Sequence, residues 1–179
     1  FILNISDKKI FKLINLKSMI FGGERFPINS IKKILKYLNN TNIYNVSGPT
    51  ECTCICSAHE VSKKEILNLK NIPVGKINSY FKFKLISDQN KRGRGELYLE
   101  GPAVSKGYYN NSEGTNKKFY KINKYFGYKT GDIFEKYKKN NFKIIGRVDN
   151  QIKFLGHRIE LEEIENTIMK KYNIDECML

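Results

Sequence analysis

The chain contains the stretch GRVDNQIKFLGHRIELEEIE at residues 146–165, in which a strand pattern is followed by a helical one. Residues 151–155 have the composition of a β-strand. The helix beyond them begins with glutamates and ends with lysines, which suits the helix dipole. Its apolar face is formed by Leu161, Ile164, Ile168 and Tyr172. A piece of this size cannot bury its own apolar face, so we expect it to pack on the rest of the chain or on a segment outside it.

Upstream of this stretch, strand and helix patterns alternate. A strand over residues 16–21 ends at two glycines, and a helix with one apolar face follows, formed by Ile28, Ile31, Leu35 and Leu38. Ser62 and Glu65 have the spacing of a capping box and predict a short helix near residues 62–69. Further strands are predicted over residues 42–46, 81–86, 96–100, 128–137 and 142–145. The alternation indicates a mixed α/β (α+β) fold.

The composition is that of a folded chain of one domain or slightly more: 179 residues, 40% hydrophobic and 28% charged. No apolar run approaches the roughly 18 residues that a membrane span needs, and the first residues lack a secretory leader pattern. We therefore expect a cytoplasmic protein with no membrane span.

The formal net charge is +14, which favours an anionic partner such as nucleic acid, a membrane surface or an acidic protein. Only five of the 32 basic residues are arginine, and the lysines are scattered along the whole chain rather than gathered in a stripe. Direct readout of nucleic acid favours the planar arginine fork. A solvated lysine surface explains this composition better than nucleic-acid binding does.

Three of the four cysteines, Cys52, Cys54 and Cys56, alternate in the sequence CTCIC and would lie on one face of a strand. The spacing usual for structural zinc is absent, so the pattern favours small apolar thiols that face a core or pocket. Disulfides are not expected without a secretory signal.

Three loops combine glycine with charged side chains at the ends of predicted elements: GPTE at residues 48–51, TGD at 130–132 and GRVD at 146–149. Glu51 is a hard oxygen ligand suited to Mg²⁺. Asp132 can accept hydrogen bonds from both hydroxyls of a ribose, and Arg147 can bind ribose or phosphate oxygens. Each of these short motifs alone is an ordinary turn sequence. Together they predict a nucleotide site.

In order along the chain, these loops and their flanks resemble the AMP-forming adenylation superfamily. The matching segments are FGGE (21–24), YNVSGPTE (44–51), GELYLEGPAVSKGYYN (95–110), YKTGD (128–132) and the opening stretch at 146–165. Asp149 and Leu161 make the chain more similar to the amino-acid-activating branch, which comprises adenylation domains of nonribosomal peptide synthetases and D-alanine:carrier-protein ligases.

The resemblance implies an ATP-dependent ligase that forms an aminoacyl-adenylate and passes the acyl group to a phosphopantetheine thiol on an acyl or peptidyl carrier protein. Glu51 would then bind Mg²⁺, Thr50 would contact phosphate, Asp132 would hold the ribose and Arg147 would contact ribose and phosphate. Asp149 would be the hinge of a small lid.

The same resemblance assigns further residues. Those along the nucleotide, besides Asp132 and Arg147, would be Gly22, Gly23, Glu24, Asn45, Ser47 and Gly48. Those of the substrate pocket would be Gly22, Val46, Cys54 and Ile55. Since these pocket residues are small or medium and apolar, we expect a modest, uncharged amino acid as substrate. Ser47 stands where the family usually has an aromatic ring against adenine.

The resemblance also predicts the domain organisation. Residues 1–148 would be the C-terminal part of the large adenylation subdomain, with sheets, helices and a distorted barrel-like portion. Residues 149–179 would be the hinge and the start of a small α+β lid. The family's phosphate loop and the catalytic lysine of its lid have no match here, and Lys153 and Lys170 do not correspond to that lysine. We therefore expect the 179-residue chain to be an inactive fragment of an active ligase.

Two other functions remain open. One is an acyl- or aryl-acid (CoA) ligase of the same superfamily. The other is a non-catalytic remnant or interaction module whose basic surface binds an acidic carrier protein.

Overall fold

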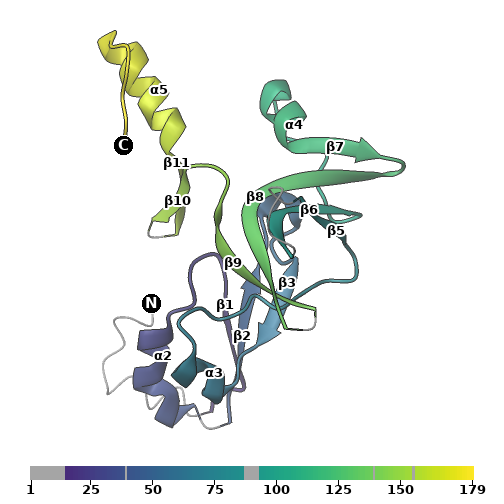
Figure 1. The fold of residues 1–179 in the computed structure, drawn as a ribbon, viewed down its shortest axis with the longest axis vertical. Coiled ribbons are helices and arrows are strands. Elements are labelled where there is room, and N and C mark those ends of the chain that lie inside the picture. Colours follow the sequence, from purple (N-terminus) through teal and green to yellow (C-terminus); the bar gives the residue numbers. More distant parts are fainter. Residues whose placement is uncertain (1–14, 39, 87–92, 139, 155) are drawn as a thin grey trace.

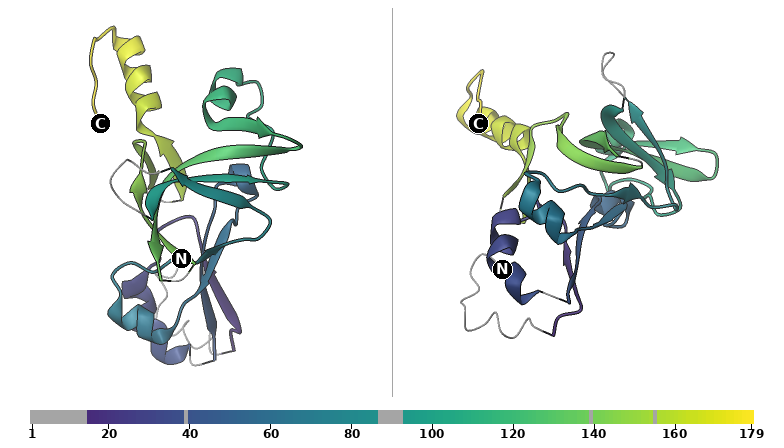
Figure 2. Two further views of the ribbon diagram at one scale, coloured as in Figure 1. Left: turned by 45° about the vertical axis from the view of Figure 1, so that its right-hand side comes forward. Right: turned by 60° about the horizontal axis from the view of Figure 1, so that its bottom comes forward.

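A computed structural model describes residues 15–38, 40–86, 93–138, 140–154 and 156–179. It contains two main β-sheets, a separate two-stranded hairpin and short helices, and so confirms the mixed α/β class (Figure 1). Helices α2 and α3 lie at one end of the molecule, and α5 projects from the other (Figures 1 and 2). None of the helices in the described ranges is long and apolar enough to cross a bilayer.

The first sheet carries α2 and α3. Its four strands run in the order β1 (Ser18–Phe21), β2 (Asn42–Ser47), β3 (Ser57–Glu60) and β4 (Lys76–Ile77), with β1 and β2 parallel and the rest antiparallel. Helix α2 (Ile28–Ile34) continues as the 3₁₀ turn η3 (Leu35–Tyr37), and α3 (Lys63–Asn68) follows β3. Ile31, Ile34 and Leu38 from the first helical segment join Ile43 and Ile66 in one buried cluster.

The predicted capping box at the start of α3 is confirmed. The Ser62 hydroxyl accepts a hydrogen bond from the Glu65 backbone N–H at 3.2 Å, and the Glu65 carboxylate accepts one from the Ser62 N–H at 2.9 Å. Glu65 also contacts the His59 ring at 3.0 Å, which ties α3 to β3. The local pattern was sufficient here because both partners lie within one helical turn.

The second sheet is centred on β8 (Tyr125–Tyr137), which is paired on both edges. Its other strands are β5 (Lys82–Ile86), β6 (Arg94–Gly101), β7 (Phe119–Ile122) and β9 (Asn141–Arg147). The first half of β8 pairs with β7 and the second half with β9, while β6 follows both halves along the opposite edge. No closed barrel forms among the described strands, so the barrel-like portion is an open, bent sheet.

Strand β8 changes register at Gly131. Lys129 pairs with Tyr98 and Ile133 with Glu96, so that β8 has extra residues opposite β6. Gly131 takes up the irregularity with a φ of 75°, and its N–H donates to the Glu96 carboxylate at 3.0 Å. A residue with a side chain would be strained at this φ. The bend lies directly beside Asp132.

The C-terminal segment is built of β10 (Gln151–Phe154), β11 (His157–Glu160) and α5 (Leu161–Tyr172). The predicted strand and helix are confirmed, and β11, which pairs antiparallel with β10, is an addition. Of the described residues in this segment only Gln151 is buried. The apolar face of α5 is therefore not part of a buried core: Ile164 is 40% and Tyr172 63% exposed. The predicted division at residue 149 stays a prediction.

The three cysteines do not share one face of a strand as predicted, although Cys52 and Cys56 do face the hydrophobic core. Cys52 ends the 3₁₀ turn η4 (Thr50–Cys52), and Thr53 and Cys54 both have positive φ, so that the next strand, β3, begins only at Ser57. Cys52 and Cys56 are buried whereas Cys54 is exposed. Alternation predicts a shared face only in an extended chain, and the two left-handed residues break it. In the described part of the chain no three potential metal ligands of the Cys, His, Asp and Glu types cluster.

Elements with no apolar periodicity were missed. Helix α4 (Ser112–Lys118) contains no large apolar residue, and it begins where the Asn111 side chain accepts a hydrogen bond from the Gly114 N–H at 2.7 Å. Strands β3, β4 and β7 are each four residues or shorter. Short segments of this kind carry too few residues for a period to be recognised.

Candidate active site

One candidate cluster lies where β8 meets β9. Arg147 donates from Nη1 to Oδ1 of Asp132 at 2.6 Å, and from Nε and Nη2 to the two carboxylate oxygens of Asp149 at 2.6 and 2.9 Å. Lys118, at the end of α4, donates to Asp149 Oδ2 at 3.2 Å. The predicted ribose residue, its neighbouring cation and the predicted hinge residue are thus joined directly.

The antiparallel pairing of β8 and β9 accounts for this geometry. Asp132 is the direct partner of Arg147 in the ladder. Asp149 returns to the same guanidinium because the Val148 N–H donates to the Gly131 carbonyl at 2.8 Å. A Cβ on Gly131 would lie 2.5 Å from Nη2 of Arg147. The glycine of the TGD motif thus leaves room for the arginine.

The charges in this cluster are only partly exposed. Burial raises the pKa of Asp132, and Arg147 offsets part of that rise. Burial also raises the pKa of Asp149, but hydrogen bonds and charges from Arg147 and Lys118 outweigh it and lower the net value. Burial alone would lower the pKa of Arg147; the two aspartates raise it. The guanidinium is therefore a permanent cation shared between two carboxylates.

A second cluster surrounds Glu51, which lies in η4 just after β2. Its Oε1 accepts hydrogen bonds from the Tyr108 hydroxyl at 2.7 Å and from Arg158 Nη1 at 2.8 Å. The Tyr108 hydroxyl also lies 3.3 Å from that of Tyr128, which is fully buried in β8. Arg158 belongs to β11, so this ion pair connects the C-terminal hairpin to the turn η4.

Glu51 is 6% exposed, and its second oxygen, Oε2, is buried with no hydrogen-bond partner among the described residues. Burial raises the pKa of the carboxyl, but hydrogen bonds from Tyr108, the backbone and Arg158 outweigh it and lower the net pKa. The group is therefore an anion at neutral pH. A buried carboxylate with one unpaired oxygen fits the hard oxygen donor that Mg²⁺ prefers.

The two clusters are separate. Within the described ranges no hydrogen bond or ion pair links Glu51 to Asp132 or Arg147. They share strand β8, since Tyr128 backs the Glu51 cluster and Asp132 lies four residues further along the same strand. The three side chains predicted for one nucleotide site, Glu51, Asp132 and Arg147, therefore do not contact one another directly. They form two clusters that are connected through strand β8.

The glycine loop after β1 contacts the C-terminal hairpin. Glu24 accepts a hydrogen bond from the Gly156 N–H at 2.6 Å. Gly22 lies against Val46, since a Cβ on Gly22 would come within 2.7 Å of Val46 Cγ2. Two of the four predicted pocket residues are therefore neighbours. Gly23, next in the loop, has a φ of 86° and open space around it.

The remaining predicted residues lie on or near the loop from β2 to β3. Asn45 is buried, and its amide donates to the Pro73 carbonyl at 2.8 Å, which gives it a role within the fold. Gly48 is approached by this chain's own backbone, because a Cβ there would lie 2.5 Å from the Cys56 nitrogen. Ser47 is half-buried, whereas the others are exposed, namely Thr50, Cys54 and Ile55.

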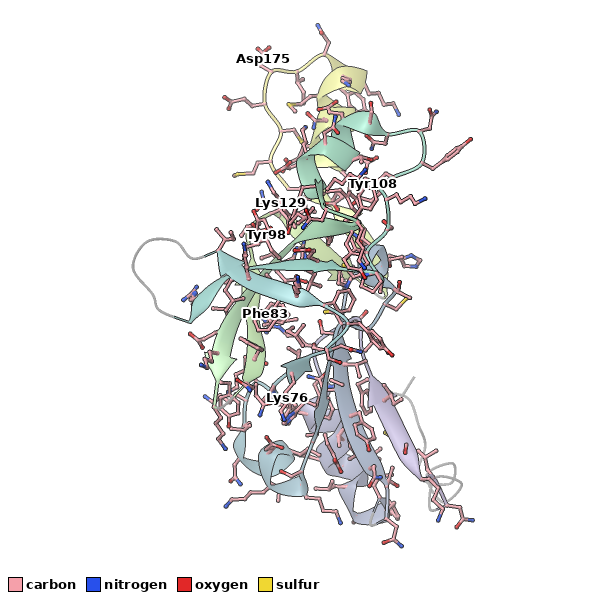
Figure 3. The ribbon with its side chains drawn as sticks, turned by 90° about the vertical axis from the view of Figure 1, so that its right-hand side faces the viewer. Lys76, Phe83, Tyr98, Tyr108, Lys129 and Asp175 are labelled. Atoms are coloured by element: carbon pink, nitrogen blue, oxygen red, sulfur yellow. The ribbon has the colours of Figure 1, made fainter. Side chains whose placement is uncertain are left out.

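Four residues of the two clusters were not predicted as site residues: Tyr108, Tyr128, Lys118 and Arg158. Tyr108, Tyr128 and Arg158 lie inside segments that carry the resemblance, and that position was the available signal. Tyr108 lies beside α4 (Figure 3), where its backbone N–H donates to the Thr115 hydroxyl at 2.9 Å. Lys118 lies in α4, which has no sequence pattern of its own, so nothing indicated it.

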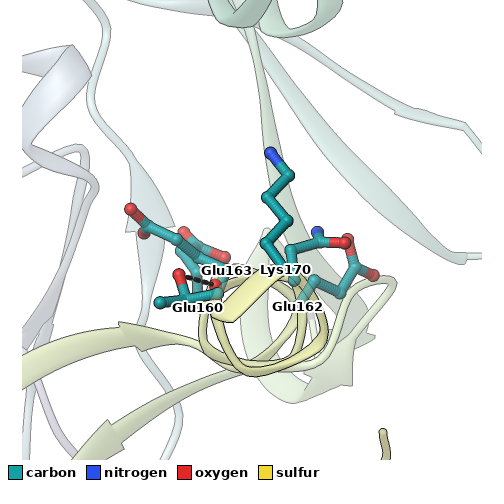
Figure 4. Close-up of a pocket in the computed structure, with 6 residues that line it drawn as sticks. Glu160, Glu162, Glu163 and Lys170 are labelled. Carbon is teal, nitrogen blue, oxygen red and sulfur yellow. Dashed lines mark hydrogen bonds between the residues drawn. The ribbon is translucent and has the colours of Figure 1, made fainter. Parts of the chain in front are cut away.

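Two surface hollows lie away from both clusters. One, of about 510 Å³, is lined by Glu160, Glu162, Glu163, Asn166, Thr167 and Lys170 on α5 and its start (Figure 4). Another, of about 530 Å³, lies between α2 and the end of α3. No predicted site residue lines either hollow. The two side-chain clusters, rather than these hollows, hold the candidate chemistry.

Comparison with known proteins identifies the family of the chain. The model of the family described as "AMP-binding enzyme" matches residues 3–109, which is more than half of the chain. The chain belongs to this AMP-binding family. The match includes Glu51 and Tyr108, and the Asp132–Arg147 cluster follows beyond it.

Curated relatives of this AMP-binding chain include D-alanine--D-alanyl carrier protein ligases. That of Streptococcus pneumoniae strain R6 is 32% identical over 171 residues, which is 93% of this chain and 33% of the relative. That of Streptococcus pyogenes serotype M5 is 34% identical over 161 residues, which is 88% of this chain and 31% of the relative. The chain spans about a third of the length of these relatives.

Solved structures agree on the fold. The adenylation domain AlmE of Vibrio cholerae, in complex with glycyl-adenosine-5'-phosphate, is 29% identical with a TM-score of 0.72 and covers 87% of this chain and 30% of its own. PA1221, an NRPS protein containing adenylation and PCP domains, has a TM-score of 0.75 at 22% identity and covers 93% and 37%. The second likeness concerns the fold alone.

Proposed function

We propose that these residues are part of an ATP-dependent ligase that converts an amino acid into an aminoacyl-adenylate and then transfers the acyl group to a carrier protein. The observation that carries the proposal is the Asp132–Arg147–Asp149 cluster in an AMP-binding chain. It is supported by relatives whose names give a D-alanine substrate and a carrier protein, and by AlmE with its bound glycyl-adenylate.

Each half-reaction breaks and forms one bond. A carboxylate oxygen of the amino acid attacks the α-phosphorus of ATP, and pyrophosphate leaves. The thiol sulfur of phosphopantetheine then attacks the acyl carbon, AMP leaves, and the thiol proton passes to solvent. The ligase of which these residues would form part supplies position and charge for both steps.

Each cluster has a role in this proposal. Asp132 would accept hydrogen bonds from the ribose hydroxyls in addition to the one that its Oδ1 accepts from Arg147 Nη1. Arg147 would also neutralise phosphate charge, and Asp149 would hold the guanidinium in place. Glu51, through Oε2, would bind Mg²⁺, which when bound would neutralise charge on the phosphates.

The substrate is proposed to be a small or medium, uncharged amino acid. Gly22 and Val46 touch, and Val46 is apolar, so no charged partner is offered at that point of the pocket. Cys54 and Ile55, which are exposed here, would line another part of it.

The test is amino-acid-dependent exchange of pyrophosphate into ATP by the protein expressed from its complete coding frame. Asp132→Ala is expected to abolish exchange, whereas Glu135→Ala, on an exposed site of the same strand, should leave it unchanged. The 179-residue chain alone should show no exchange above a control without protein. Exchange that needs a fatty or aryl acid would replace the amino-acid proposal, and its absence with every acid would favour a non-catalytic carrier-binding module.

A further inference from the structure

Tyr108 is fixed from several sides. Its backbone N–H donates to Thr115 in α4, and its ring meets that of Phe119 edge-on, with 5.2 Å between centroids. Its hydroxyl lies between Tyr128 and Glu51, at 3.3 Å and 2.7 Å from their oxygens. These contacts fix the place of the Tyr108 hydroxyl, from which it donates to Glu51 Oε1.

The hydrogen bonds to Glu51 are unevenly distributed. Oε1 accepts from both Tyr108 and Arg158, while Oε2 is buried and accepts from no described residue. Buried acceptors are almost always paired, so one that is left open calls for a ligand or a bound ion. Because Tyr108 and Arg158 both donate to Oε1, Oε2 is the oxygen that remains unpaired.

The two donors differ in origin. Arg158 comes from the C-terminal hairpin and is 37% exposed, so its hydrogen bond exists only while the hairpin lies against η4. Tyr108 lies between β6 and α4 and packs on Phe119 of β7. Its contact with Glu51 therefore does not depend on the hairpin.

We propose that Tyr108 is a positioning residue for metal binding: its hydroxyl, backed by Tyr128, holds Oε1 of Glu51 so that the unpaired Oε2 is left as a ligand for a divalent cation. The inference rests on the proposed function, in which Glu51 is a metal ligand. Tyr108 itself does not touch the cation or the nucleotide. Its contribution is to fix the carboxylate in one orientation before the cation arrives.

The chain offers a matched pair of variants for the test. Tyr108→Phe removes the hydroxyl and keeps the ring, and Tyr109→Phe makes the same change at the next residue, which is 100% exposed. Mn²⁺ serves as the probe, and its binding to the protein from the complete coding frame is followed by electron paramagnetic resonance. Tyr108→Phe should weaken Mn²⁺ binding about tenfold, the order expected for one hydrogen bond to a charged group. Tyr109→Phe should bind as the unaltered protein does.

A second readout separates positioning from folding. In the exchange assay Tyr108→Phe should raise the KM for Mg²⁺ about tenfold, with the rate at saturating Mg²⁺ unchanged. A lower melting temperature with unchanged Mn²⁺ affinity would make Tyr108 a structural residue and overturn the proposal. If Tyr108→Phe does not fold, Tyr128→Phe takes its place; it should weaken Mn²⁺ binding about threefold, and an unchanged affinity would again overturn the proposal.

Glu51→Gln distinguishes this inference from the function on which it rests. If Glu51→Gln binds Mn²⁺ as tightly as the unaltered protein, the metal role of Glu51 fails and the inference fails with it. If Glu51→Gln loses Mn²⁺ while Tyr108→Phe retains it, only the inference on Tyr108 fails.

Discussion

The five-stranded sheet and the C-terminal segment from β10 to α5 are held in place by different forces. The sheet buries Leu97, Leu99 and Phe134 almost completely, whereas the only buried residue described in the C-terminal segment is the polar Gln151. Apolar burial stabilises the sheet as a unit. Polar contacts such as Arg158–Glu51 and Gly156–Glu24 attach the C-terminal hairpin, so it should detach at a far lower cost.

The largest expected effect comes from the sheet. Leu99→Ala removes a fully buried side chain and should lower the free energy of unfolding by about 3 kcal/mol. Ile164→Ala, on α5 where the side chain is 40% exposed, should change it by less than about 0.5 kcal/mol. Urea denaturation of the chain measures both. Similar losses for the two would mean that α5 is packed as tightly as the sheet.

The next effect compares two glycines with similar backbone. Gly131 and Gly156 have φ values of 75° and 83°, but only at Gly131 would a Cβ meet other atoms, those of Arg147 and Asp149. Gly156→Ala should cost about 1 kcal/mol for the backbone alone. Gly131→Ala should cost about 2 to 3 kcal/mol, because the side-chain cluster must also move. Equal losses in urea denaturation would contradict this account of the cluster.

A smaller effect concerns the ion pair between the two regions. Arg158→Gln leaves Glu51 with Tyr108 alone and should increase the rate of limited proteolysis around residues 148–154 about fivefold. Lys153→Gln removes the same charge from an exposed site of the same hairpin and serves as the control. If both variants are cut equally fast, net charge rather than the Arg158–Glu51 contact holds the hairpin.

The smallest effect is expected from pH. The pKa values of Glu51 and Asp149 are lowered in the folded chain, so their stabilising contribution is complete above the ordinary values of 4.5 and 3.8 and is lost as pH falls through the lowered values. The raised pKa of Asp132 acts in the opposite sense, since its contribution is lost as pH rises through that value. Because Glu51 holds Arg158 of the hairpin, proteolytic protection of the hairpin should decline as pH falls below 4.5. A decline near neutral pH would point to a group other than these carboxylates.

Local sequence was sufficient for features whose partners are close along the chain. The Ser62–Glu65 capping box, the strand at β2 and the helix at α5 were all predicted, because each depends on a period or a spacing of a few residues. Asp132, Arg147 and Asp149 were selected from loop motifs that lie at the bend of β8 and the end of β9. The prediction that three cysteines share one strand face also depended on a local period. It was wrong because two left-handed residues, Thr53 and Cys54, interrupt the extended backbone that this period requires.

What only the tertiary structure decided is which donors meet which carboxylates. Tyr108 reaches Glu51 across 57 residues, and Arg158 reaches it across 107. Lys118 reaches Asp149 from a helix with no sequence pattern of its own. Sequence determines local backbone preference and side-chain chemistry, which are properties of neighbouring residues. The pairing of distant charges depends instead on sheet register and on the bend at Gly131, and both arise only when the strands pack together.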